Sequence, residues 1–387
     1  MRKILPILIF GIIILFPIAA GASPLNPVEE IMSDFRGIYA PHLEASVSNL
    51  QGDGIQEIMS DFDVTRMLAE ATTGQLSIQP GSVLRNILLL LGAEVYATFR
   101  IMIMILVLAV MCSLLTNLSD NLKSGQVGQI AFFACYVLIV SVALAAFYGA
   151  IVIGQQTVAN MVIIMRTLLM LVIAALVGSG APITAAMIHP TILVSIEIMV
   201  TIIQNVLIPV LMLSAALNVV NNLSDKFGAQ KLAELLNKFV KWSLALMLTI
   251  FVAIVGIQSI ATGGADGISI KVARYAATNF IPVVGGILSE TVETVMACSV
   301  VMKNAIGVVG IIIIAIVAAY PLIRIAAQIL IFRVTAAVIQ PIADSRIVAC
   351  ITGLADVISV MFAIVAAVGV MFLIMLTIII NTGHFLM

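Results

Sequence analysis

The sequence predicts an all-α, polytopic membrane protein with about six to eight transmembrane helices, preceded by a signal peptide and a small exported helical segment. Of the 387 residues, 62% are hydrophobic and only 10% are charged, and the mean hydropathy is +1.23. A soluble domain is about 45–50% apolar and about 25% charged. A water-soluble fold of this size could not hide so much apolar surface. Much of the chain is therefore expected to face lipid.

The first 22 residues have the pattern of a secretory signal peptide. Two basic residues precede the apolar run 4–20, and a small-x-small sequence follows at 20–22. We expect cleavage after Ala22, so that the mature chain begins at Ser23. An uncleaved membrane anchor is the alternative, because the run is long enough to remain in a bilayer. Both interpretations export the segment that follows.

Residues 23–84 are predicted to form an acidic, extracytoplasmic helical segment. It contains nine of the 19 acidic residues of the chain and two basic ones, and the sequence EIMSDF occurs in it at 30–35 and again at 57–62. Apolar residues recur at i, i+3, i+4 and i+7 around each copy, which predicts two amphipathic helices. These helices either pack on each other or on the membrane domain, or they dock another extracytoplasmic protein through Phe35 and Phe62.

The polytopic transmembrane domain is predicted to occupy residues 85–387. About 20 apolar residues cross a bilayer as a helix. The candidate segments are 101–118, 127–153, 158–177, 192–217, 240–260, 305–330 and 357–380. Residues 86–99 are interrupted by Glu94, which favours a surface-lying or re-entrant helix. Residues 305–339 are too long for one span, and Pro321 with Arg324 can divide them.

The orientation signals in the sequence conflict. If every candidate segment crosses, the loop 218–241 lies on the exported side, yet it contains four lysines and two acidic residues. Positive residues normally mark the cytoplasmic side. Either one earlier segment does not cross, with 158–177 the weakest because of Arg166, or 85–118 holds an additional crossing. The sequence therefore does not decide whether an odd or an even number of crossings precedes this loop.

The same basic loop predicts a local amphipathic helix. Its apolar stripe comprises Leu232, Leu235, Leu236 and Phe239. Glu234 can pair with Lys238 one turn later, and Trp242 follows at a position typical of the membrane interface. The segment is either an interfacial helix that enters the next span or a contact for a peripheral cytoplasmic partner, made through Lys231 and Lys238.

No motif for catalysis or cofactor binding is found. The sequence lacks a Gly-rich phosphate loop ending in Lys-Ser/Thr, an HExxH motif and a Gly-x-Ser-x-Gly elbow. We therefore expect no enzymatic activity, no cofactor, no metal and no nucleic-acid partner. The three histidines are far apart in sequence. The four cysteines lie in or beside apolar segments and are interpreted as small buried hydrophobic residues.

Ten ionisable residues lie within or beside the apolar segments. They are Arg166, Glu197, Glu290, Glu293, Lys303, Arg324, Arg333, Asp344, Arg346 and Asp356. A charge at a helix centre costs about 2.5–3.5 kcal/mol on insertion scales, so such groups face protein or water and mark a pathway or an ion pair. For Arg166 and Glu197 we favour structural pairing with each other over transport.

The segment 279–310 contains the candidate pathway or gating residues. They are Pro282, Gly285, Gly286, Glu290, Glu293, Lys303 and Asn304. The proline and the two glycines predict a helix break, after which Ser289 can cap a helix whose first turns carry both glutamates. Broken helices at membrane depth are tolerated only where protein or water surrounds them. The alternative is an amphipathic extracytoplasmic or cytoplasmic helix with solvated acids.

A second break is expected at 304–310, where Gly307 and Gly310 also permit close helix approach. Along a continuous helix, Lys303 would lie roughly 20 Å beyond Glu290, so the two side chains cannot pair unless the chain folds back at this break. We therefore expect the two acids to line a hydrated surface and Lys303 to pair with another segment.

Three sequence blocks, in this order behind the signal-like start and the acidic segment, resemble the stage III sporulation protein AE family of endospore-forming bacteria. The blocks are SDKFGAQKLAELLNKFVKW, ADGISIKVARYAATNFIPVVGGILSETVETVMACSVVMKNAIGVVG and AAVIQPIADSRI. The resemblance implies a permease-like or gating membrane subunit of the multiprotein sporulation channel that links mother cell and forespore. It also implies a mother-cell-derived outer forespore membrane location and support of late forespore development.

The same resemblance implies several partners and no catalytic residues. The partners are other stage III sporulation proteins, including a separate ATPase, ring-forming intermembrane proteins and a forespore membrane protein. The missing nucleotide-binding motif fits a subunit served by such an ATPase. A stand-alone secondary transporter and a non-conducting scaffold are the alternatives. No second copy of the segment 279–310 is found, although a carrier often shows repeated halves with matched broken helices.

Overall fold

The computed structural model describes residues 27–48, 50, 63–73, 80–121, 125–223, 228–262 and 284–381. Every regular element in these ranges is a helix. In chain order the elements are α2 (Pro27–Ser48), α4 (Val64–Thr73), α5 (Pro80–Asn121), α6 (Gly125–Gly178), α7 (Pro182–Ile202), the π-helix η1 (Ile203–Leu207), α8 (Ile208–Leu223), α9 (Gln230–Thr262), α11 (Val284–Ile339) and α12 (Ser345–Asn381).

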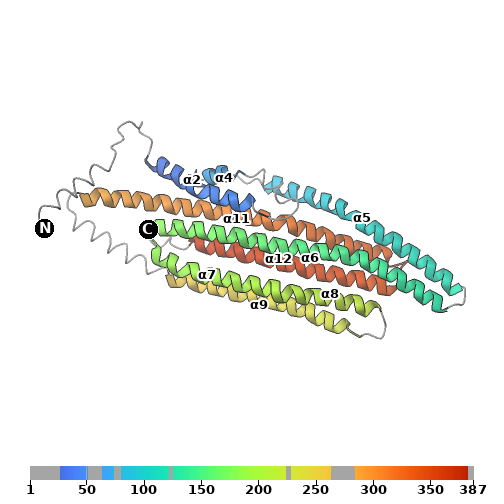
Figure 1. Ribbon diagram of the computed structural model, residues 1–387. Coiled ribbons are helices and arrows are strands. Elements are labelled where there is room, and N and C mark those ends of the chain that lie inside the picture. Colours follow the sequence, from blue (N-terminus) through green and yellow to red (C-terminus); the bar gives the residue numbers. More distant parts are fainter. Residues whose placement is uncertain are drawn as a thin grey trace.

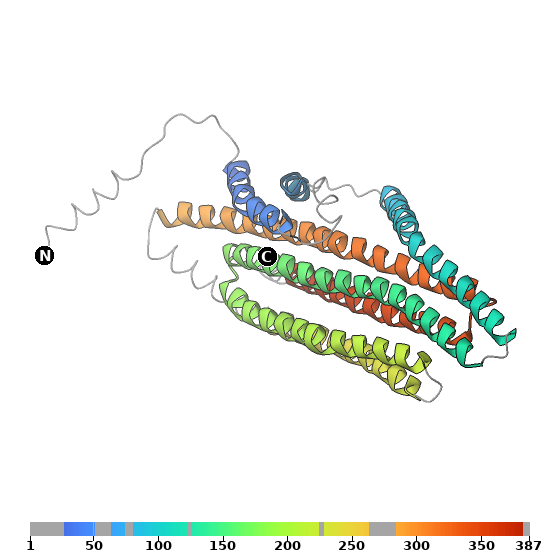
Figure 2. The ribbon, with the colours of Figure 1, turned by 45° about the vertical axis from the view of Figure 1, so that its right-hand side comes forward.

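The long helices form an elongated, antiparallel bundle (Figures 1 and 2). Helices α6, α11 and α12 pack together at its centre, with α5 on one side and α7, α8 and α9 on the other. The last turns of α5, α8 and α11 lie at one end of the bundle, together with the first turns of α6, α9 and α12. We call this end the Leu223 end, after the last residue of α8.

Six helices in the described ranges are long and apolar enough to cross a membrane, which confirms the predicted all-α membrane fold. They are Leu88–Leu115, Phe132–Gly178, Pro182–Leu223, Gln230–Gln258, Thr291–Ile339 and Ser345–Asn381. Three predicted boundaries are wrong. Helix α5 runs through Glu94, α6 joins the segments 127–153 and 158–177, and α11 runs through Pro321.

Tertiary packing explains why α6 continues through its polar centre. The Thr157 hydroxyl donates a hydrogen bond to the carbonyl of Ile153 at 2.7 Å. Both Thr157 and Asn160 are buried in the bundle. Gly154 is covered by Met361 of α12, so closely that a Cβ there would lie 2.0 Å from the methionine methyl carbon. Gly154 and Thr157, which lie between the two predicted segments, are thus buried within the helix bundle.

The single long α6 bears on the orientation conflict in the sequence. Three candidate spans, not four, precede the basic loop between α8 and α9. If each of these helices crosses the membrane once, the loop lies on the opposite side from the start of α5, because three is an odd number. With that crossing count, the positive-inside signal no longer conflicts with an exported start.

Helices α2 and α4 pack on each other and on α6 and α11. The hydroxyls of Ser46 on α2 and Thr167 on α6 lie 2.7 Å apart, and Thr65 of α4 donates a hydrogen bond to Glu44 of α2 at 2.7 Å. Their apolar residues, including Leu43 and Leu68, join the main core. The first amphipathic helix is thus confirmed.

The structure does not describe the side chains of the two predicted docking residues, Phe35 and Phe62. The second EIMSDF copy, at 57–62, lies outside the described residues and includes Phe62. Phe35 lies on α2, but its side chain is outside the described set. Docking through these two residues stays a prediction.

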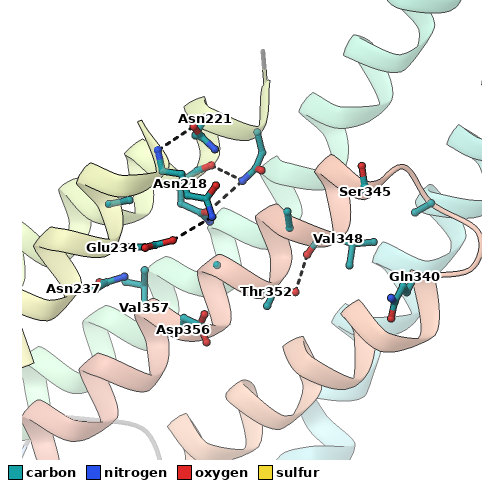
Figure 3. A pocket seen from close by; sticks show the side chains of 16 residues that line it. Asn218, Asn221, Glu234, Asn237, Gln340, Ser345, Val348, Thr352, Asp356 and Val357 are labelled. Atoms are coloured by element: carbon teal, nitrogen blue, oxygen red, sulfur yellow. Dashed lines mark hydrogen bonds between the residues drawn. The ribbon is translucent and has the colours of Figure 1, made fainter. Parts of the chain in front are cut away.

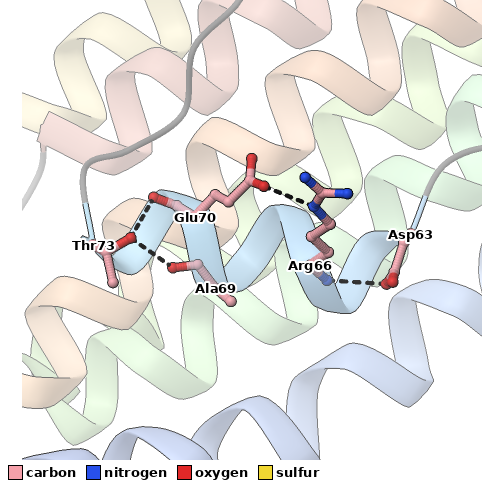
Figure 4. A network of polar contacts seen from close by, with 5 residues as sticks. All are labelled: Asp63, Arg66, Ala69, Glu70 and Thr73. Atoms are coloured by element: carbon pink, nitrogen blue, oxygen red, sulfur yellow. Dashed lines mark hydrogen bonds and ion pairs between the residues drawn. The ribbon is translucent and has the colours of Figure 1, made fainter.

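Helix α4 is stabilised by its own polar side chains (Figure 4). Asp63 caps the helix by accepting a hydrogen bond from the backbone N–H of Arg66 at 3.0 Å. One turn later, Glu70 accepts a hydrogen bond from the Arg66 guanidinium at 2.8 Å. This bond and the charge of Glu70 raise the pKa of Arg66 above its ordinary value. The contacts explain how so short a helix persists in a polar segment.

Candidate functional site

The start of α11 differs from the predicted broken helix. The helix begins at Val284, so Gly285 and Gly286 lie in its first turn, and Ser289 is too far inside to cap it. Pro282 lies outside the described residues. A helical glycine costs only about 1 kcal/mol relative to alanine, which the packing of a 56-residue helix readily offsets.

The structure does not bring the glutamates and Lys303 together. Helix α11 continues without interruption through 304–310, so the predicted second break is wrong and the chain does not fold back. Glu293 is exposed, whereas Lys303 is only 1% exposed and lies among buried core residues. Glu290 is part of the helix, but its side chain is outside the described set. Pairing of Lys303 with another segment stays a prediction.

Asn304 follows Lys303 into the interior of the bundle. Its side-chain oxygen is buried and has no hydrogen-bond partner within the described part of the chain. Among the described side chains of the candidate residues, Glu293 is therefore exposed near the start of α11, whereas Lys303 and the side-chain oxygen of Asn304 are buried further along.

We expect the double substitution Glu290→Gln and Glu293→Gln to preserve membrane insertion but to impair forespore support. The reason is that Glu293 is exposed near the helix start and contributes little to packing, whereas acidic side chains would be needed on a hydrated surface. Protein abundance and spore yield are measured together, with Glu70→Gln as the control. Normal spore yield at normal abundance would exclude these acids from any transport path.

Ion pairs account for most of the ionisable residues singled out in the sequence. Seven of the ten ionisable residues singled out in the sequence, together with Glu94, form four pairs among the described residues. The pairs are Arg166–Glu197, Arg324–Glu94 at 3.7 Å, Arg333–Asp356 at 3.4 Å and Arg346–Asp344 at 3.3 Å. The predicted pairing of Arg166 with Glu197 is confirmed. A low-dielectric environment demands such pairing.

The Arg166–Glu197 pair lies on the surface of the bundle, between α6 and α7. The two side chains are 48% and 51% exposed, and the neighbouring Met170, Val194 and Ile198 are exposed as well. A charged pair within an apolar face is costly against lipid. This part of the surface is therefore suited to contact water or another protein.

A polar cleft that the sequence analysis missed lies at the Leu223 end, between the α8–α9 and α11–α12 pairs (Figure 3). Its volume is about 610 Å³. Glu234 and Asp356 contribute carboxylates, and Ser345 and Thr352 contribute hydroxyls. The amide side chains are those of Asn218, Asn221, Asn222, Gln230, Asn237 and Gln340.

Hydrogen bonds between the helices fix the walls of the cleft. Asn218 donates from its side-chain amide to the carbonyl of Cys350 on α12 at 3.0 Å. Gly353 makes this approach possible, since a Cβ there would lie 2.3 Å from the Asn218 amide. Across the turn, Asn221 accepts a hydrogen bond from the backbone N–H of Gln230 at 3.1 Å. Hydrogen bonds between elements of the fold thus hold the walls of the cleft in place.

The predicted basic helix forms the first turns of α9, beside this cleft. Lys231, Lys238 and Trp242 are exposed there, and Glu234 accepts a hydrogen bond from Gln230 at 3.2 Å. The helical prediction is confirmed. Whether Lys231 and Lys238 contact lipid headgroups or a cytoplasmic partner stays a prediction.

These features define a polytopic α-helical membrane protein with four ion pairs among the described residues of its bundle. The family model of Stage III sporulation protein AE matches residues 62–383, and the chain belongs to this family. The chain is also 29% identical, over 354 residues, to "Stage III sporulation protein AE" of Bacillus subtilis (strain 168), with 89% of each chain covered. No solved structure matches the chain. The resemblance of the three sequence blocks is thereby confirmed.

Proposed function

We propose that this membrane protein is a permease-like or gating subunit of the multiprotein sporulation channel between mother cell and forespore. It resides in the mother-cell-derived outer forespore membrane and acts with a separate ATPase and with ring-forming intermembrane proteins. Membership of the sporulation family supports the setting. The lack of a nucleotide-binding motif supports a separate energy source.

The length of the apolar surface is the observation that carries a role within an assembly. Large apolar side chains are exposed along α6 from Ile130 to Val177, which are 47 residues apart and therefore about 70 Å along the helix axis. The hydrocarbon core of a bilayer is about 30 Å thick. Lipid can cover less than half of this surface, and other proteins are needed to cover the remainder.

The ion pairs favour a second candidate, a non-conducting scaffold of the same complex. The four pairs connect helices or fix turns, so these charges have structural roles without any flow of solute. A stand-alone secondary transporter is less well supported, because it would leave the long apolar surface without a protein neighbour.

Site-specific crosslinking in sporulating cells tests the assembly. Cysteines replace the exposed Tyr148 or Met170 of α6, and the buried Met161 of the same helix is the control. We expect crosslinks to other sporulation membrane proteins from at least one exposed position and none from Met161. Absence of any protein crosslink from both exposed positions would contradict the role as a channel-complex subunit.

The basic loop before α9 is expected to face the mother-cell cytoplasm. Three candidate spans separate it from the exported side, and its lysines favour the cytoplasmic side. With the chain produced in the cell membrane of intact, non-sporulating cells, a membrane-impermeant thiol reagent in the medium should label Thr73→Cys but not Lys231→Cys, and it should label both after lysis. Labelling of Lys231→Cys before lysis would reverse the assignment.

A further inference from the structure

We propose that the polar cleft at the Leu223 end binds a ligand that carries a guanidinium or an ammonium group. This inference concerns a site that the family resemblance does not assign, and it does not depend on the proposed channel role. It rests on the charge of the cleft lining and on the hydrogen-bond acceptors that the lining presents.

Several donors of the cleft are engaged by the protein itself. The amide of Asn218 donates to Cys350, and the amide of Asn222 donates to the Asn218 carbonyl at 2.7 Å. Gln230 donates to Glu234 at 3.2 Å, and the Thr352 hydroxyl donates to the carbonyl of its own helix at 2.8 Å.

Acceptors, in contrast, remain available. The side-chain oxygen of Asn237 is buried and has no hydrogen-bond partner within the described residues. Glu234 and Asp356 are exposed at the cleft, and each carboxylate offers about four lone-pair sites, more than the contacts from Gln230 and Arg333 occupy. A complementary ligand must therefore bring hydrogen-bond donors.

The charge of the lining selects a cation over an anion. Among the described residues that line the cleft there are two carboxylates and no Lys, Arg or His. A guanidinium has five N–H donors and an ammonium has three, and neither has an acceptor, so both match the unoccupied acceptors. Phosphates and carboxylate ligands would meet like charges instead.

The size of the cleft suits a small ligand, and a guanidinium of the protein itself already contacts one of the two carboxylates. A volume of about 610 Å³ is within the usual range for small-ligand sites. Arg333 of α11 lies beside the cleft and contacts Asp356 at 3.4 Å. An external cation would compete with this guanidinium, so removal of Arg333 should strengthen ligand binding whereas removal of the acids should weaken it.

Tryptophan fluorescence of the purified full chain in detergent provides the test. Trp242 is the one tryptophan of the sequence and follows Asn237 by five residues on α9. The probes are N-acetyl-arginine amide, N-acetyl-lysine amide and, as an uncharged isostere, N-acetyl-citrulline amide. At least one cationic probe should give a saturable change, with affinity about tenfold above that of the citrulline compound.

Matched variants locate the binding. The double substitution Glu234→Gln and Asp356→Asn should lower the affinity about tenfold, Arg333→Gln should raise it, and Glu70→Gln on α4 should leave it unchanged. Unaltered thermal unfolding shows that the variants are folded. Equal affinity for the arginine and citrulline probes, or unchanged affinity in the folded double variant, would overturn the proposal.

Two further probes distinguish the source of the cation. An arginine-centred pentapeptide that binds more tightly than N-acetyl-arginine amide would identify a segment of a partner polypeptide. Tighter binding of spermidine than of both arginine probes would identify a free polyamine. Failure of all cationic probes to bind would exclude the site while leaving the channel assignment untouched, since that assignment is tested by crosslinking.

Discussion

Replacement of Gly307 by leucine is expected to push α11 away from α12 and to destabilise the bundle. A Cβ at this position would lie 2.2 Å from Cγ1 and 2.3 Å from Cδ1 of Ile380, and leucine adds three more carbon atoms. Overpacking of this kind costs about 1–3 kcal/mol or more. The gain in helix propensity from removing a glycine is only about 1 kcal/mol, so the steric cost should dominate.

Thermal unfolding with a thiol-reactive dye measures this effect, because Cys112, Cys298 and Cys350 are buried until the bundle opens. Gly149→Leu on α6 is the matched control, since a Cβ there meets nothing within 4 Å in the described ranges. The truncation Ile380→Ala should restore part of the stability of the Gly307 variant. Equal melting temperatures for the two leucine variants would contradict the close helix contact.

The sequence predicted the elements that depend on local pattern. Hydrophobic runs identified the membrane helices, and the period of 3.6 residues identified α2 and the start of α9. The predicted close approach at Gly307 and Gly310 was also correct: these glycines are covered by Ile380 and Leu168. In each case the deciding information lay within a few neighbouring residues.

The wrong predictions concern helix breaks, which depend on contacts between distant segments. Pro321 and Asn304 weaken a helix locally, but α11 is held along its length by α6 and α12. Glu94 argued against a span because its partner, Arg324, lies 230 residues away in sequence. Local signals therefore overestimated the number of interruptions and, with it, the number of crossings.

The polar cleft escaped the sequence analysis for a related reason. Its walls come from α8, α9, α12 and the turn between α11 and α12, so the set exists only in the folded bundle. A local signal was nevertheless present, since Gln230, Glu234 and Asn237 recur at helical spacing on the face of α9 opposite to its apolar stripe. Polar stripes on predicted membrane helices thus merit the same attention as single charges.

Replacement of Glu94 by leucine is expected to weaken the attachment of α5 to α11. Glu94 is 17% exposed, lies 3.7 Å from Arg324 and accepts a hydrogen bond from the Tyr320 hydroxyl at 3.2 Å. Loss of one member of a buried pair costs about 3–5 kcal/mol, because the remaining charge stays buried without compensation. Since Arg324 is 32% exposed, we expect a cost below this range, about 2–3 kcal/mol.

Two further variants separate the charge from the shape of the side chain. Glu94→Gln keeps an acceptor for Tyr320 and should cost less than Glu94→Leu, because only the charge is lost. The double variant Glu94→Leu with Arg324→Leu should recover much of the stability, since it removes both charges and leaves an apolar contact of similar volume. The dye-based melting assay ranks the three variants. A double variant no more stable than Glu94→Leu alone would show that packing of α5, and not the ion pair, holds this helix on the bundle.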